Sequence, residues 1–251
     1  MISKNQIKFL HSLLLKKNRQ KYQQVILEGQ RLIEESVKAG AELEYICLTE
    51  IAKTKVLENH LLNQIESYII SDIDLKKISD TKTSQGVIAL ASTKKYNNAK
   101  LDSLKSNNIV ILDGIQDPGN LGTIFRTCVW FGIKSIILTS NCSDPFNLKC
   151  VRSGVGSHFY LEKIIIEDSQ KVAEYLREKK YNVLVADLDG EDIFDIKKLN
   201  KWSLILGSEA HGISDAFEIF PKVTIPKIGD IESINVSVAS GIILNKLVNN
   251  Y

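Results

Sequence analysis

Short apolar runs alternate with segments of helical periodicity along almost the whole of this 251-residue chain. From residue 109 onward, strand-like runs occupy 109–112, 135–138, 163–166, 182–186, 203–206 and 223–225, and helical patterns occupy 121–131, 170–179 and 236–248. Such alternation predicts an α/β fold in which a mostly parallel sheet carries helices on both faces. Residues 1–95 alternate in the same way on a smaller scale, which predicts a separate small α/β domain.

A polar stretch without apolar periodicity, Ser92–Lys100, separates the two alternating regions. Such stretches are typical of interdomain linkers. We therefore predict a first domain at 1–95, a linker at 96–107 and a second domain at 108–251.

The composition is that of an ordinary globular protein, with 44% hydrophobic and 25% charged residues. No apolar run approaches the ~20 residues of a membrane span, and the first residues lack the plan of a secretory signal. Four scattered cysteines form no CxxC pair and have no histidine at metal-ligand spacing. These features predict a cytoplasmic protein that uses neither a membrane nor a metal.

Charge is distributed unevenly between the two predicted domains. Residues 1–100 carry a net charge of +5 and residues 101–251 a net charge of −3. Six cations, among them Lys16, Lys17 and Arg19, precede the first acid, Glu28. Two interpretations stay open at this point: a contact for RNA phosphates, or a solvated helix face.

Unusual polar residues follow the strands that end at Leu112 and Leu206, where ligands bind in sheets of this kind. After the first strand, Asn120 is a candidate N-cap, and Arg126 suits an anionic partner. After the second, a carboxylate between two glycines, Glu209, is poorly explained by packing, and we expect it to orient a neighbour such as Arg126.

A third loop, after Ile225, leads back into a long apolar helix. Ser233 or Asn235 is a candidate cap for that helix. Three isoleucines, Ile225, Ile228 and Ile234, would make a suitable wall for a purine ring.

Together these loops resemble the three motifs of the SpoU (TrmH-like) RNA methyltransferases of the SPOUT superfamily. The matching segments are Asn120-x-Gly122-x-x-x-Arg126, Gly207-x-Glu209-x-x-Gly212 and Ser233-Ile234-Asn235-Val236-Ser237-Val238-Ala239. Ile234 stands where the family more often has leucine. Residues 1–95 resemble the accessory RNA-binding domain of many members, through Lys16-Lys17-Asn18-Arg19, Leu27-Glu28-Gly29 and Ser84-Gln85-Gly86-Val87.

The resemblance implies a homodimer with a deep trefoil knot that methylates a ribose 2′-hydroxyl in RNA, ribosomal RNA being favoured, with S-adenosylmethionine as cofactor. By position, the family's catalytic residues correspond to Arg126, Asn120, Glu209, Ser233 and Asn235. Its cofactor contacts correspond to Leu206, Gly207, Ile225, Ile228, Ser233, Ile234 and Asn235. RNA contacts are expected at Lys16, Lys17, Arg19, Arg126 and Arg152.

Alternative functions stay open. The same reaction on transfer RNA, or RNA binding without catalysis on the same fold, fits the same motifs. A nucleotide-dependent oxidoreductase is disfavoured because Gly114, Gly119 and Gly122 do not follow the G-x-G-x-x-G pattern.

Overall fold

The computed structural model describes residues 1–79, 81, 84–96 and 99–249. The chain divides into two compact units, Met1–Asn97 with Asp144–Tyr160, and Asn98–Ser143 with Leu161–Tyr251. Within the described ranges, no helix combines the length and apolar character that a membrane span needs. The expected linker at 96–107 includes Asn97 and Asn98, which lie outside the described residues, and a short 3-10 helix, η2 (Leu101–Ser103).

The first unit contains a four-stranded sheet in the order β1-β4-β2-β3. β4 runs antiparallel to both of its neighbours, and β2 and β3 run parallel. The elements before residue 97 are α1 (Lys4–Ser12), α2 (Lys16–Tyr22), β1 (Gln24–Glu28), α3 (Gln30–Lys38), β2 (Leu43–Leu48), α4 (Glu50–Leu57), β3 (Ser67–Ile69), α5 (Asp72–Ile78), β4 (Val87–Ser92) and η1 (Lys94–Tyr96).

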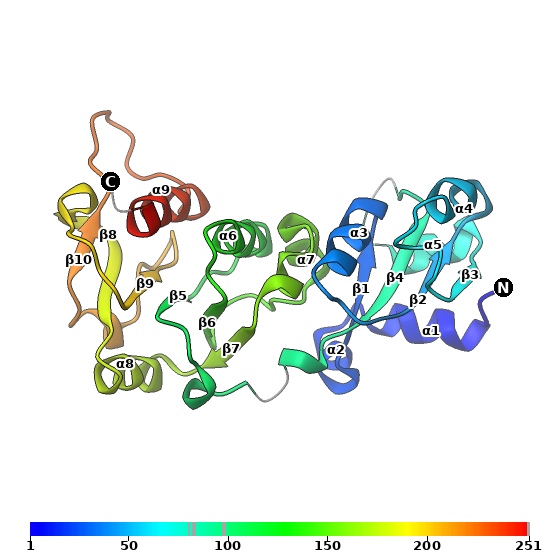
Figure 1. Cartoon of the computed structure of the whole chain (residues 1–251), viewed down its shortest axis with the longest axis horizontal. Coiled ribbons are helices and arrows are strands. Elements are labelled where there is room, and N and C mark those ends of the chain that lie inside the picture. The colour runs from blue at the N-terminus through cyan, green and yellow to red at the C-terminus, as the bar shows by residue number, and fades with distance from the viewer. Residues whose placement is uncertain (80, 82–83, 97–98, 250–251) are drawn as a thin grey trace. The chain divides into compact units, whose positions relative to one another are not determined.

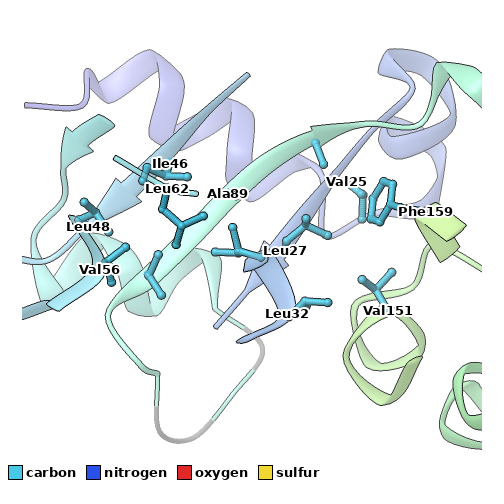
Figure 2. Close-up of a cluster of buried hydrophobic side chains, with 13 residues drawn as sticks. Val25, Leu27, Leu32, Ile46, Leu48, Val56, Leu62, Ala89, Val151 and Phe159 are labelled. Atoms are coloured by element: carbon cyan, nitrogen blue, oxygen red, sulfur yellow. The ribbon is translucent and has the colours of Figure 1, made fainter. Parts of the chain in front are cut away.

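A segment from the middle of the chain completes the core of this unit. It comprises α7 (Leu148–Gly154) and η3 (Ser157–Tyr160). Val151 and Phe159 from this segment pack in one buried cluster with Val25 and Leu27 of β1 (Figure 2). Residues 144–160 therefore pack with the first unit, although their sequence position falls inside the predicted second domain.

Arg19 ties the same segment to α2. The Arg19 side chain is 5% exposed, and its Nη2 forms an ion pair with Asp144 Oδ2 at 2.5 Å. Its Nη1 donates to the carbonyl oxygens of Leu13 and Leu14, each at 2.8 Å. The expectation that Arg19 contacts RNA is corrected here, because a buried guanidinium with these partners has a structural role.

The second unit contains a six-stranded sheet in the order β10-β8-β9-β5-β6-β7. Every pairing in it is parallel, which confirms the predicted α/β fold with a parallel sheet. Its central strands, β5 and β9, are mostly apolar because helices cover both of their faces. The elements are β5 (Asn108–Leu112), α6 (Pro118–Trp130), β6 (Ser135–Thr139), β7 (Lys163–Glu167), α8 (Ser169–Glu178), β8 (Asn182–Asp192), η4 (Ile193–Asp195), β9 (Trp202–Leu206), η5 (Asp215–Phe217), β10 (Lys222–Thr224) and α9 (Val236–Asn249).

Helices cover this sheet on both faces (Figure 1). On one face, α8 contributes Val172 and Leu176 to a buried cluster with Ile109 and Ile111 of β5. On the other, α6 and α9 pack against each other. Because the strands are parallel, the loops after β5, β9 and β10 all leave the sheet at its carboxyl edge, and the candidate site lies there.

Candidate active site

The loop after β5 presents Asn120 from the first turn of α6. The N-cap of this helix is Asp117, whose Oδ1 accepts the backbone N–H of Asn120 at 2.8 Å, and Pro118 occupies the first turn. The expectation that Asn120 is the cap is therefore wrong. With Asp117 and Pro118 starting the helix three residues earlier, the Asn120 side chain remains available for other contacts.

The loop after β9 is a tight turn that carries Glu209. Ser208 and Gly212 exchange two backbone hydrogen bonds of 2.8 Å each. A Cβ added at Gly207 would lie 2.6 Å from the carbonyl oxygen of Gly212, so only glycine fits there. Gly212 has a φ of +67°, in the left-handed region. The two glycines of the second motif thus give the loop its shape.

Glu209 is the hub that joins the three motifs. Its carboxylate accepts hydrogen bonds from Asn120 Nδ2 at 3.2 Å, from Asn235 Nδ2 at 2.9 Å and from the backbone N–H of Val236 at 3.1 Å. Asn235 Nδ2 also donates to Asn120 Oδ1 at 3.0 Å. The predicted neighbour was Arg126, but Glu209 orients two amide side chains and the start of α9 instead.

Asn235 also starts α9, as expected of one of the two candidate caps. Its Oδ1 accepts the backbone N–H of Ser237 at 2.9 Å. A carboxylate beside a helix N-terminus is favoured by the helix dipole, so Glu209 stabilises the start of α9. Ser233 lies exposed in the preceding loop and lines the cavity described next.

A cavity of about 500 Å³ lies beside this cluster, between the middle of β8, the loops after β9 and β10, and the start of α9. Six of the seven predicted cofactor contacts line this cavity, and Asn235 is the exception. The lining comprises Leu206, Gly207, Ile225, Ile228, Ser233 and Ile234, together with Ala186–Leu188, Ser208, Glu209, Gly212, Ile213, Val223, Thr224, Pro226, Lys227, Gly229, Ile231, Glu232, Val236, Ala239 and Ile243. Its walls are mainly apolar, and Ile228 and Ile231 are exposed on the projecting loop of 225–235.

One charged group in this wall is held by an ion pair. Burial alone would raise the pKa of Asp187, but hydrogen bonds from Lys222 Nζ and from the backbone N–H groups of Asp189 and Leu188 outweigh it and lower the pKa. Lys222 Nζ lies 2.9 Å from Asp187 Oδ2. The Asp187 carboxylate is therefore ionised, and its hydrogen-bonding capacity is used by groups of the protein.

Arg126 lies apart from this cluster. It follows Asn120 by six residues on α6, which turns it by about 240° and carries it about 9 Å along the helix axis. It is exposed and does not line the cavity. The arrangement thus brings Asn120, Glu209 and Asn235 together within one chain but leaves Arg126 on another face of α6.

Two residues that support the site, Asp113 and Ser214, were not among the residues predicted from the sequence. Asp113, the residue after β5, is 1% exposed and accepts the hydroxyl of Ser214 at 2.9 Å and its backbone N–H. Ser214 directly precedes the short helix η5, and its side chain makes no capping bond there. The one signal in the sequence that could have indicated Asp113 is its position, an acidic residue directly after an apolar strand.

The remaining predicted RNA contacts lie in the first unit. Lys16 and Lys17 are exposed on the first turn of α2. Arg152 is half-buried on α7.

Comparison with known proteins shows the family to which this chain belongs. The model of the SpoU rRNA Methylase family matches residues 107–245, more than half of the chain. The chain belongs to the SpoU rRNA methylase family. A second model, the MRM3-like substrate binding domain, matches residues 4–89.

Relatives of this family resemble the chain over nearly its full length. It is 28% identical to the Bacillus subtilis 23S rRNA (guanosine(2553)-2′-O)-methyltransferase RlmP, over 98% of this chain and 97% of the relative. A TrmH-family structure from Porphyromonas gingivalis, described as a putative RNA methyltransferase, matches with a TM-score of 0.84 and 30% identity, covering 100% of both chains. An AdoMet-bound rRNA methyltransferase from Sinorhizobium meliloti matches with a TM-score of 0.80 and 25% identity, over 97% of this chain and 94% of that one.

Proposed function

We propose that this protein methylates a ribose 2′-hydroxyl of ribosomal RNA with S-adenosylmethionine. The observation that carries the proposal is the hydrogen-bonded cluster of Asn120, Glu209 and Asn235, which joins all three family motifs beside an apolar-walled cavity. The relative from Bacillus subtilis acts on 23S rRNA, which favours ribosomal over transfer RNA.

The cavity fits the proposed cofactor in size and chemistry. A volume of about 500 Å³ lies within the range of ligand sites, and an apolar wall with a few polar groups suits an adenosine moiety. Ile225, Ile228 and Ile234 would cover the base, and the backbone at Leu206 and Gly207 would supply hydrogen bonds. When bound, S-adenosylmethionine supplies an electrophilic methyl group on a sulfonium sulfur.

The chain's residues position the RNA for an in-line transfer. In that step the 2′-oxygen–methyl bond forms, the sulfur–methyl bond breaks to leave a thioether, and the hydroxyl proton departs. A guanidinium, with a pKa above ~12, is a poor base. We assign Arg126 to the adjacent phosphate and the developing oxyanion, with a phosphate oxygen or water as proton acceptor. Asn120, Glu209, Ser233 and Asn235 hold the ribose and the loops in place.

We further propose that Arg126 acts in the partner subunit of a homodimer. It lies away from the Glu209 cluster of its own chain, so a second subunit is needed to bring a guanidinium to each cavity. Exposed apolar side chains on α6 and α9, Trp130 at 84% and Val238 at 54%, suit such an interface. The trefoil knot expected for the family, built from the loop of 225–235 and α9, remains part of this proposal.

Mixed dimers test the shared site. A heterodimer of one Arg126→Ala subunit and one Glu209→Gln subunit has one complete site if Arg126 acts across the interface, and none if it acts within its own chain. We expect the mixed dimer to methylate RNA well above the low activity of either variant alone. Continued inactivity of a heterodimer purified through two different tags would refute the shared site.

The first domain would bind RNA through Lys16, Lys17 and Arg152. We keep the domain limits of 1–95 and 108–251 as proposals and add residues 144–160 to the RNA-binding unit, because they complete its core. The four cysteines are free, which supports a reducing, cytoplasmic location.

The reaction itself is tested with tritiated S-adenosylmethionine and separate pools of unmodified ribosomal and transfer RNA. We expect label in ribosomal RNA as an alkali-resistant 2′-O-methylated dinucleotide, lost with Arg126→Ala. Label in transfer RNA alone would contradict the substrate assignment. Cofactor and RNA binding without label in either pool would favour a binding protein.

A further inference from the structure

The amino edge of the sheet in the second unit is lined with lysines. Each of the strands β5, β6, β7, β8 and β9 either begins with a lysine or follows one within three residues. Because these strands are all parallel, the lysines share the edge opposite to the candidate active site. They are Lys105, Lys134, Lys163, Lys180 and Lys201.

Hydrogen bonds hold the lysine-bearing segments side by side. The hydroxyls of Ser106 and Ser135 lie 2.8 Å apart, and the phenol of Tyr181 donates to the carbonyl oxygen of Ser106 at 2.6 Å. The backbone N–H of Lys163 donates to the carbonyl oxygen of Lys134 at 3.2 Å. The row therefore crosses five adjacent strands, a span of about 19 Å at ~4.8 Å per strand.

One of the five lysines is used inside the protein. Lys201 Nζ donates to the carbonyl oxygen of Lys179 at 2.5 Å and lies 4.3 Å from the centre of the Tyr181 ring. The other four have no such role: three are exposed, Lys163 is partly exposed, and none forms an ion pair within the described part of the chain. We call these four, Lys105, Lys134, Lys163 and Lys180, the lysine edge.

Helix dipoles do not account for the whole of the lysine edge. α6 and α8 end near Lys134 and Lys180, where a cation is favoured. Lys105 and Lys163 follow only short 3-10 helices, so this effect is small there. The carboxylates nearest in sequence, Asp102, Glu162 and Glu178, do not offset the row through ion pairs. Residues 101–251 carry a net charge of −3, so the row is a local excess of positive charge in an acidic unit.

We propose that the lysine edge is a second contact surface for the phosphate backbone of the substrate RNA, distant from the reacting ribose. A row of unpaired lysines about 19 Å long matches several consecutive phosphates, and contacts of this kind give affinity and orientation without sequence readout. An acidic protein partner fits less well, because lysine is depleted in protein–protein interfaces. This inference rests on the proposed function, since it assumes an RNA substrate.

The test compares two triple variants with equal loss of charge. Lys105→Gln/Lys134→Gln/Lys180→Gln removes three exposed members of the lysine edge. Lys171→Gln/Lys197→Gln/Lys198→Gln removes three exposed lysines of the same unit that lie outside the lysine edge. Binding to fluorescein-labelled fragments of an unmodified 23S rRNA transcript is measured by anisotropy over a series of salt concentrations, together with calorimetric binding of S-adenosylhomocysteine and the turnover at saturating RNA.

For the lysine-edge variant, we expect the slope of log affinity against log salt to fall by about 2, and RNA affinity to drop on the order of 100-fold at ~0.1 M salt. Cofactor binding and turnover at saturating RNA should match the wild type, and the control variant should keep its RNA affinity. Equal RNA affinity of the lysine-edge variant and the wild type, or equal losses in both variants, would overturn the inference. Neither result would contradict the proposed methylation. A wild-type protein that binds no RNA would overturn both the lysine-edge inference and the proposed function.

Discussion

The buried carboxylate of Asp113 accepts both the hydroxyl and the backbone N–H of Ser214, the hydroxyl at 2.9 Å. These two residues are 101 positions apart and link the end of β5 to the end of the loop that carries Glu209. The other end of that loop continues β9, where the N–H of Asp113 donates to the carbonyl oxygen of Leu206 at 2.9 Å. Both ends of the Glu209 loop are thus fixed by one residue.

Replacing Asp113 with asparagine should loosen this loop while keeping the shape of the side chain. The amide accepts at one oxygen only, so one donor of Ser214 loses its partner, at about 1.4 kcal/mol. We expect about tenfold weaker binding of S-adenosylhomocysteine by calorimetry. Ser214→Ala removes only the hydrogen bond of the hydroxyl and should weaken the binding of S-adenosylhomocysteine less. An Asp113→Asn protein with wild-type cofactor affinity would show that the link does not position the loop.

The sequence predicted the fold well because its signals are local. The six apolar runs from residue 109 onward all proved to be strands of the parallel sheet, and every end lay within a few residues of the expected position except that of β8, which runs on to Asp192. One helix beyond residue 109, α7, was missed, since it has only seven residues.

The site was predicted only in part, because its contacts are long-range. Motif order brought Asn120, Glu209 and Asn235 into consideration together, but their hydrogen bonds join residues 26 to 115 positions apart. The pairing of Arg19 with Asp144 spans 125 positions, and no local pattern distinguishes a buried arginine from the exposed lysines beside it.

Glu209→Gln tests the hub of the candidate site. The carboxylate accepts from three donors, and an amide nitrogen in its place would face one of them. We expect turnover at saturating RNA and cofactor to fall at least about tenfold. Glu174→Gln, an exposed change on α8, is the matched control and should keep wild-type turnover. Full activity in Glu209→Gln would leave the cluster without a role in catalysis.

Asp144→Ala should destabilise the first unit. It leaves the buried guanidinium of Arg19 without its counter-charge, a loss that typically costs about 3–5 kcal/mol. Urea unfolding measures the change. The double variant Arg19→Met/Asp144→Leu should recover most of the lost stability, because it removes both charges together. Single and double variants that are equally unstable would show that packing, and not the ion pair, sets the cost.

Acid should destabilise the protein through His158. Burial lowers the pKa of this side chain to about 4, and the hydrogen bond between its Nε2 and the carbonyl oxygen of Pro145, 2.7 Å long, opposes the shift only in part. The unfolded chain takes up a proton below pH ~6.5, while the folded protein does not until about pH 4. The contribution of the neutral His158 to the free energy of unfolding is therefore fully present above pH ~6.5. It is lost as the pH falls toward 4, by about 3 kcal/mol over the window.

Urea unfolding at a series of pH values measures this loss of stability. His158→Gln should show a smaller loss between pH 6.5 and 4, and His11→Gln, at an exposed histidine, should follow the wild type. Parallel pH profiles for wild type and His158→Gln would mean that other groups cause the acid sensitivity.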